Sequence, residues 1–296
     1  MNTETMNSDN TNDIHGGVML VHLSIAGWAA RKIDKKAAQE VANAHGVAST
    51  KGAYYKSLVE GSSLETIKTV ATQARTAHYR RTLPWSDAGP RILSNLGYLD
   101  YMQEIGKLKQ EYEGAVAKFL QDYPLLRQEA KRLLGTLFNP DDYPDLQQVA
   151  DKFSFKVSVL PLPKGEDFRC DIGAEEAARV RAEIEANTTS AIQQSLADAY
   201  DRVAVVVEAF IDRLADPKTI FRDSLVENAR SLAEVLPSLN ITGDQRLAAL
   251  AESLKSKLCA ADPDVLRQNH TTRRQAYDAA VQMRGDLVAF FGGQLQ

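Results

Sequence analysis

Residues 174–215 read AEEAARVRAEIEANTTSAIQQSLADAYDRVAVVVEAFIDRLA, and their apolar side chains recur mostly at steps of three, four or multiples of these. This spacing places the apolar side chains on one face of an α-helix. Glu175 and Glu176 stand where the positive end of the helix dipole would lie. At ~1.5 Å per residue the helix spans roughly 60 Å, which is longer than a compact core requires. We therefore expect coiled-coil-like or stalk-like packing against later helices.

Three more helices are predicted after this stretch. They cover residues 219–236, 243–260 and 264–291, and they are separated by Pro217, by Pro237 with Asn240, and by Pro263. Such connections are typical of antiparallel helices, so this region predicts a helical bundle or an extended coiled-coil-like hairpin. The apolar stripe of the long helix could form the core of this bundle, or it could pair with a second copy of the chain.

Two stretches upstream predict β-strands. Val18–Ile25 is a short apolar run with partial alternation, and Phe153–Val159 alternates cleanly between apolar and polar residues. A turn at Pro161–Gly165 follows, and Phe168–Ile172 is expected to return as a partner strand. These strands predict a small sheet and not a β domain.

Helical patterns fill most of the remaining sequence before residue 172. The predicted helices cover residues 27–45, 62–82, 98–122 and 124–138. Gly46 is expected to end the first of these helices. The second is expected to end before Leu83, because Leu83 precedes Pro84, and Pro124 is expected to separate the last two helices. Asn139–Pro144 is a dense turn signal and the best candidate for an internal boundary.

These patterns predict a mostly α fold of the α+β class. An N-terminal α/β part contains the small sheet, and a C-terminal part consists of long helices. We expect three regions along the chain: a disordered lead-in at 1–17, a basic helical domain with a small β element at 18–172, and a helical bundle or stalk at 173–296.

Charge is distributed unevenly over the 296 residues, whose net charge is −4. Residues 18–92 contain eleven Lys and Arg against five Asp and Glu, whereas residues 1–17 carry −3 and residues 93–296 carry −7. A basic first third joined to an acidic remainder suggests two surfaces with different partners, although ordinary variation in charge placement also explains it.

The sequence indicates a soluble protein of the cytoplasm. No apolar run approaches the roughly 18–20 residues that cross a bilayer, so we expect no membrane partner. The lead-in has neither a basic nor an apolar segment typical of a secretory signal. The chain has only two cysteines, which fits a reducing compartment.

Known catalytic and cofactor motifs are not found in the sequence. The five histidines and two cysteines lack metal-ligand spacing, and no glycine-rich loop ends in Gly-Lys-Ser/Thr. No Gly-x-Ser-x-Gly elbow is present either. We therefore predict a non-enzymatic protein without a metal or cofactor. An acid–base site built from residues distant in sequence would not be visible in this way.

The segment Arg75–Arg91, RTAHYRRTLPWSDAGPR, concentrates arginines and aromatic residues; we call it the basic–aromatic segment. Arginines can bind phosphates while aromatic rings stack on unpaired bases. The candidate nucleic-acid-binding residues are Arg75, Tyr79, Arg80, Arg81, Trp85, Arg91, Lys51 and Lys56.

Two other interpretations of the same segment stay open. Leu83, Pro84 and Trp85 could form a buried corner, with Arg91 pairing with Asp87 or capping helix carbonyls. Alternatively the segment docks a protein partner, because Trp, Tyr and Arg also dominate interface hot spots.

Four strings of this sequence resemble an uncharacterised family carried by bacteriophages, conjugative plasmids and integrative elements. They are WAARKIDK at 28–35, RTAHYRRTLPW at 75–85, LFNPDDYP at 137–144 and VLPLPKGEDFR at 159–169. The resemblance covers roughly Val18 to the start of the long helix and extends beyond it. Members are sometimes encoded near MoxR-type AAA+ ATPases, which implies an accessory role beside a separate motor. No activity is established for the family, so it supplies no functional residues.

The leading functional expectation is a non-enzymatic phage or mobile-element protein that binds nucleic acid, preferably single-stranded DNA, through the basic–aromatic segment. The alternative is a structural or adaptor protein that forms homo-oligomers through its long helices and engages a AAA+ ATPase.

Overall fold

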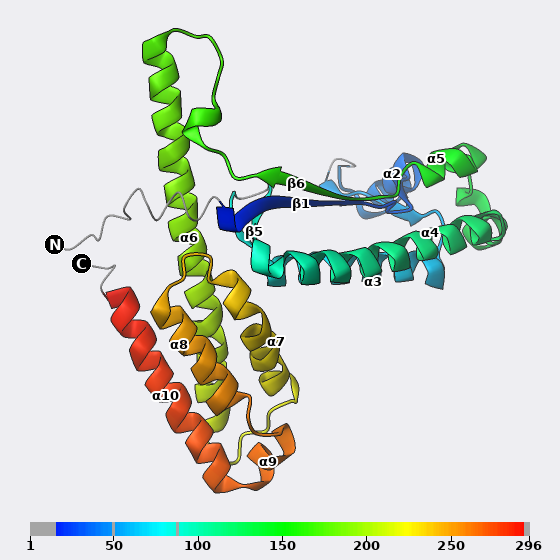
Figure 1. The fold of residues 1–296 in the computed structure, drawn as a ribbon. Coiled ribbons are helices and arrows are strands. Elements are labelled where there is room, and N and C mark those ends of the chain that lie inside the picture. Colours follow the sequence, from blue (N-terminus) through cyan, green and yellow to red (C-terminus); the bar gives the residue numbers. More distant parts are fainter. Residues whose placement is uncertain (1–15, 49–50, 87–88, 293–296) are drawn as a thin grey trace. The chain divides into compact units, whose positions relative to one another are not determined.

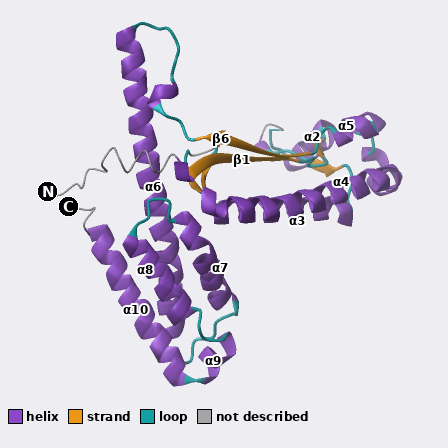
Figure 2. Ribbon diagram, viewed as in Figure 1, coloured by secondary structure: helices purple, strands orange, loops and turns teal. Residues whose placement is uncertain are grey.

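The computed structural model describes residues 16–48, 51–86 and 89–292, and it is mostly helical with a small antiparallel sheet (Figures 1 and 2). The predicted fold class is therefore confirmed. The expected disordered lead-in falls outside the described residues except for Gly16 and Gly17. No helix in the described ranges has the length and apolar content needed to cross a membrane.

The chain forms two compact units whose segments alternate along the sequence. Unit 1 contains residues 1–22, 79–101 and 158–296, and unit 2 contains residues 23–78 and 102–157. The sequence predicts consecutive domains at 18–172 and 173–296 instead. The difference arises because early residues such as Val18 and Ile92 belong to the same buried cluster as the C-terminal helices.

Unit 1 contains the long helix that the sequence predicts. Its helices are α6 (Ala174–Leu214), α7 (Ser224–Leu239), α8 (Gln245–Ser253), α9 (Pro263–Gln268) and α10 (His270–Gly292). Pro237 lies inside α7 and not between helices, and α8 continues into a π-helical turn at Leu254–Leu258. The single helix expected at 264–291 is two helices, because the Asn269 side chain accepts hydrogen bonds from Thr271 N and Thr272 N and starts α10.

The second half of α6 is the centre of a helical bundle. Helix α10 runs along it, and α7 packs against it as well (Figure 1). Val203, Val207 and Phe210 on α6 are fully buried. The apolar stripe of α6 is thus covered by helices of the same chain, which is the intramolecular alternative left open above.

The first half of α6 lies against a short segment after β6. A 3-10 turn at Gly165–Asp167 approaches the helix so closely that a Cβ on Gly165 would lie 2.7 Å from the carbonyl oxygen of Arg181. The Gly165 N–H donates to Glu185 Oε1 at 2.7 Å. Only glycine fits this approach without displacing the helix.

The main sheet has the strand order β4-β5-β1-β6. Its strands are β1 (Val18–Ala26), β4 (Leu83–Pro84), β5 (Arg91–Ser94) and β6 (Ser154–Pro161). Strands β1 and β5 are antiparallel, with Val18 opposite Ser94 and Val21 opposite Arg91. The predicted strands over β1 and β6 are confirmed. Strand β4 lies inside the basic–aromatic segment and β5 begins at its last residue, and neither strand was predicted.

The strand predicted at Phe168–Ile172 is wrong, because the structure has no strand there. The carbonyl oxygen of Phe168 accepts hydrogen bonds from Arg181 Nε and Nη2 at 3.2 Å each. This contact holds the segment against α6, so its backbone does not join the sheet.

Unit 2 contains a two-stranded sheet, which we call the β2–β3 sheet, and helices. Strands β2 (Arg31–Ile33) and β3 (Tyr55–Ser57) pair antiparallel, and α2 (Lys35–His45) follows β2. The predicted helix therefore starts eight residues later than Gly27, because Asp34 caps it by accepting from Lys36 N and Ala37 N. Gly46 ends α2 with φ 64°, as predicted.

Helix α3 (Ser62–Arg81) ends where the sequence predicts, but α4 (Tyr98–Leu134) continues through Pro124. The predicted break at this proline is wrong. Packing of the adjacent turn holds the helix together, since Tyr123 is buried and donates its hydroxyl to Pro144 O at 2.8 Å. The remaining short elements are α5 (Leu146–Ala150) and the 3-10 turns Asn95–Gly97, Gly135–Leu137 and Pro140–Asp142.

A buried ion network joins the β2–β3 sheet of unit 2 to the predicted turn region. Lys56 Nζ contacts Asp142 Oδ2 at 2.7 Å and Asp34 Oδ2 at 2.9 Å, and it donates to Leu137 O at 2.8 Å. Lys32 Nζ adds a contact of 2.6 Å to Asp142 Oδ1. The Lys56 side chain is 5% exposed, so this lysine links β3 to the Asn139–Pro144 turn.

Burial opposes the charged form of Lys56, but its bonds to Asp142 and Asp34 outweigh this and raise its pKa. Hydrogen bonds from Ala37 N and Lys56 lower the pKa of Asp34 below 3.8. Burial would raise the pKa of Asp142, but bonds from Lys32 and Lys56 lower it. All three groups are therefore charged at neutral pH.

We predict that Val203→Ala lowers the free energy of unfolding by about 2 kcal/mol, because it removes buried methyl groups from the bundle centre. Val205→Ala on the same helix is the matched control, since Val205 is 71% exposed. Urea unfolding of both variants measures the difference. Equal losses in the two variants would contradict the assignment of the buried face.

We also predict that Lys56→Met lowers the free energy of unfolding by about 3 kcal/mol, because it removes the buried cation shared by Asp34 and Asp142 and leaves only Lys32, which contacts Asp142. Denaturant unfolding at neutral pH measures this loss, and Lys35→Met, at an exposed lysine, is the control.

The loss should shrink as the pH falls below the ordinary aspartate pKa of 3.8. Both carboxylates have lowered pKa values in the folded state, so the stability they confer is present above that value and lost as they take up protons. A loss that is independent of pH would indicate packing alone.

Candidate nucleic-acid interface

The eight predicted binding residues are divided between the two units. Tyr79, Arg80, Arg81, Trp85 and Arg91 belong to unit 1, and Arg75, Lys51 and Lys56 belong to unit 2. The end of α3, the β4–β5 strands and α6 position the first group. We describe each group by itself.

Two arginines cap the end of α3 in unit 1. Arg202 on α6 donates from Nη1 to Arg80 O at 3.0 Å and from Nη2 to Thr82 O at 2.8 Å. Arg91 on β5 donates from Nε to Thr82 Oγ1 at 2.8 Å and from Nη2 to Thr82 O at 3.1 Å. The last carbonyls of a helix lack helical donors, and basic side chains commonly satisfy them. The capping role considered for Arg91 is therefore observed, while Asp87 lies outside the described residues.

Arg91 and Arg202, which we call the arginine pair, bring two positive charges together. Burial lowers the pKa of Arg91, and the charge of Arg202 lowers it further, while Asp198 acts in the opposite direction. Asp198 Oδ2 lies 2.7 Å from Arg202 Nε. In the described part of the chain, Asp198 is the carboxylate that bears on the pKa of Arg91. The arginine pair thus retains a positive charge in excess of this aspartate.

Tyr79 adds an aromatic ring beside the arginine pair. The guanidinium carbon of Arg91 lies 4.7 Å from the centre of the Tyr79 ring, a cation–π distance. The side chain of Tyr79 is 56% exposed. An exposed ring therefore lies next to the guanidinium of Arg91. Arg202, the other member of the arginine pair, comes from α6 and was not among the predicted residues.

The other predicted residues of unit 1 are more enclosed. Arg81 is 12% exposed, and its guanidinium lies 3.9 Å from Asp100 and 3.8 Å from Glu234. Trp85 is partly buried and packs against the apolar cluster of the bundle, and Arg80 is half-buried. These positions fit the alternative of a packed corner, which Ser195 reinforces by donating to Pro84 O at 2.7 Å.

Sequence reasoning missed Arg202. It lies four residues after Asp198 on a long helix, a spacing that is typical of ordinary surface ion pairs. Only the packing of α6 against the end of α3 brings it to Arg91, which is 111 positions away in the sequence. No local pattern could have marked it.

The three residues of unit 2 have different environments. Lys56 is buried in the ion network and is not part of an exposed surface. Lys51 is exposed. Arg75 is exposed, donates to Ile25 O at 3.1 Å, and lines a cavity of about 330 Å³ together with Lys68 and Trp28.

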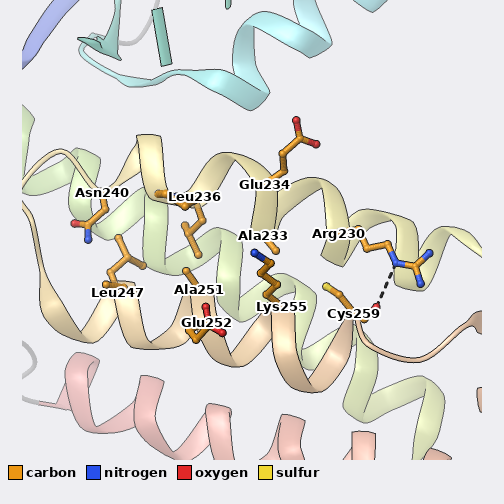
Figure 3. A pocket seen from close by; sticks show the side chains of 12 residues that line it. Arg230, Ala233, Glu234, Leu236, Asn240, Leu247, Ala251, Glu252, Lys255 and Cys259 are labelled. Atoms are coloured by element: carbon orange, nitrogen blue, oxygen red, sulfur yellow. Dashed lines mark hydrogen bonds between the residues drawn. The ribbon is translucent and has the colours of Figure 1, made fainter. Parts of the chain in front are cut away.

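Unit 1 also contains a groove of about 680 Å³ between α7 and α8, which we call the α7–α8 groove (Figure 3). Leu236, Leu247 and Ala251 supply apolar walls. Arg230 lies at one end and donates to Cys259 O at 3.3 Å, whereas Asn240 lies at the other end (Figure 3). The apolar walls suit an apolar group or a helix more than a phosphate.

Neither the surroundings of the arginine pair nor the α7–α8 groove contains a recognisable catalytic or metal-binding group among the described residues. Among the described residues, no group of three His, Cys, Asp or Glu side chains could hold a metal ion. Burial raises the pKa of Cys259, so its thiol in the α7–α8 groove is a poor nucleophile at neutral pH. What the arginine pair and Tyr79 can do is bind an anion beside an aromatic ring.

Comparisons of the chain with protein-family models, with curated proteins and with solved structures find no match.

Proposed function

We propose that this protein binds single-stranded nucleic acid through the arginine pair and Tyr79 of unit 1. A phosphate of the nucleic acid lies against Arg91 and Arg202, and an adjacent unpaired base stacks on Tyr79. The proposed function is binding alone and includes no chemical step.

One observation carries this proposal: two guanidinium groups bond to the same carbonyl, that of Thr82, and Asp198 offsets only part of their charge. Like charges held this close repel each other, and a phosphate between them relieves the repulsion while accepting charge-assisted hydrogen bonds. The carbonyl bonds preorganise both arginines, so binding costs little side-chain entropy.

The preference for single strands follows from the exposed tyrosine. Stacking on an aromatic side chain requires a base that is not already stacked and paired within a duplex. Stacking is tolerant of sequence, so we expect little sequence preference.

Of the two units, only unit 2 has a net charge that attracts nucleic acid at longer range, since unit 1 contains nineteen Lys and Arg against twenty-six Asp and Glu. Unit 2 contains sixteen Lys and Arg against thirteen Asp and Glu, whereas the whole chain has a net charge of −4. Arg75 and Lys51 are its exposed members of the predicted set. The family resemblance is our basis for proposing that the protein acts in a phage or mobile element inside a bacterial cell.

We predict that Tyr79→Ala weakens binding to single-stranded DNA about tenfold, because stacking of one base contributes ~1–3 kcal/mol. Fluorescence anisotropy of labelled single-stranded and duplex DNA at about 50 and 200 mM salt measures this, and wild-type binding should weaken steeply between the two conditions. Tyr55→Ala is the matched control, since Tyr55 is 61% exposed in unit 2.

A second variant, Arg202→Gln, tests the phosphate contact. Glutamine can still donate to the carbonyls of α3 but lacks the charge, so the salt dependence should fall by about one phosphate contact. Arg274→Gln is its control, because Arg274 also forms an (i, i+4) pair with an aspartate, Asp278. Two results would overturn the proposal. The wild type could fail to bind DNA at the lower salt, or both test variants could bind DNA as tightly as the wild type does.

The second candidate function is structural, through self-association, and the α7–α8 groove favours it. A groove with apolar walls between two helices can accept a third helix, here from a second copy of the chain. We predict that light scattering detects a dimer at tens of micromolar, and that Ala251→Arg, which fills the groove with a charged side chain, returns the protein to a monomer. A wild-type monomer at this concentration would exclude the role.

A further inference from the structure

Unit 2 contains a second cavity, which we call the Arg127 cavity, between α4 and the turn that precedes α5. Its volume is about 600 Å³, within the range of ~300–1,000 Å³ that small-molecule sites occupy. Its lining residues belong to unit 2, whereas the arginine pair belongs to unit 1. The lining residues that matter here are Tyr123, Arg127, Lys131, Phe138 and Asp145.

Two cations stand one helical turn apart at this cavity. Arg127 and Lys131 both line it, and among the described residues no carboxylate lies within ion-pair distance of either. The guanidinium of Arg127 is held 5.7 Å from the centre of the Tyr143 ring. Other basic residues of α4 are paired, for example Lys107 with Glu111 and Arg132 with Glu129. The cavity therefore offers two positive groups to a ligand.

The wall next to these cations is aromatic and rich in proline. Phe138 is partly exposed and packs on Tyr143, with ring centres 5.0 Å apart. Tyr123, Pro140 and Pro144 continue the wall. Flat, rigid side chains of this kind bind a planar ring with little loss of conformational entropy.

A single carboxylate completes the lining. Asp145 caps α5 by accepting from Gln148 N at 2.8 Å through Oδ1. A carboxylate repels an anion and accepts hydrogen bonds from hydroxyl or amino groups. A ligand that satisfies the whole cavity thus has an anionic group, a planar ring and hydrogen-bond donors.

We propose that the Arg127 cavity binds a mononucleotide. Its phosphate contacts Arg127 and Lys131, its base lies against Phe138, and a ribose hydroxyl or a base amino group donates to Asp145. No covalent step is involved. This site does not depend on the nucleic-acid interface proposed for unit 1.

Isothermal titration calorimetry of the full chain with AMP, CMP, adenosine and inorganic phosphate tests the proposal. We expect one nucleotide per chain with a dissociation constant below about 1 mM, which corresponds to −4.1 kcal/mol. Adenosine and phosphate alone should each bind at least about tenfold more weakly, since each makes only part of the contacts. Phosphate that binds as tightly as AMP would reduce the cavity to an anion site and overturn the proposal.

Substitutions at the cavity test whether AMP binds there. Lys131→Gln, and separately Arg127→Gln, should weaken AMP binding about tenfold by removing a charged hydrogen bond. Lys107→Gln and Lys109→Gln are matched controls on the same helix, at exposed lysines that form (i, i+4) pairs. Thermal unfolding verifies that each variant is folded, and Lys131 is exposed, so its replacement should not disturb folding.

Tryptophan emission supplies an independent readout. The Trp28 ring lies 5.9 Å from the Tyr123 ring, centre to centre, and Tyr123 lines the cavity. In a Trp85→Phe background the emission of Trp28 should change saturably with AMP. Two results would overturn the proposal. AMP at several times the expected dissociation constant could give neither heat nor a change in emission, or the Lys131 variant could bind AMP as tightly as the control variants do.

Discussion

Burial of the apolar face of α6 is the constraint on which unit 1 depends. Val203, Val207 and Phe210 on this face are fully buried, and they share one cluster with early residues such as Val18 and Ile92. Because this burial joins the first strand to the last helices, the compact unit cannot be a continuous stretch of sequence. It also places Arg202 beside the end of α3, where the candidate interface forms.

The basic–aromatic segment shows how one set of arginines can have a structural and a binding role at once. Arg91 and Arg202 satisfy the carbonyls at the end of α3, which accounts for their positions without any ligand. Capping needs hydrogen-bond donors but not two full charges beside a single aspartate. The excess charge and the exposed Tyr79 ring are what packing alone does not explain, and they motivate the proposed function.

Unit 2 shows the contrast between satisfied and unsatisfied cations. Lys56 is enclosed by Asp34 and Asp142, so its charge holds the β2–β3 sheet to the Asn139–Pro144 turn. Arg127 and Lys131 line a cavity, and the described residues place no carboxylate within ion-pair distance of them. The same residue types therefore have opposite roles, and only the position of acidic partners distinguishes them.

Local patterns in the sequence were sufficient for α6, β1, β6 and the C-terminal ends of α2 and α3, because helical periodicity, alternation and residues such as Gly46 act over a few positions. They failed at Pro124, where Tyr123 packing keeps α4 continuous, and at Phe168, which Arg181 holds away from the sheet. They proposed Tyr79 and Arg91 as candidates but could not show that Lys56 is buried or that Arg202 lies beside Arg91. Those features depend on contacts between residues as far as 122 positions apart, which only the folded chain brings together, since hydrophobic burial and ion pairing act through space.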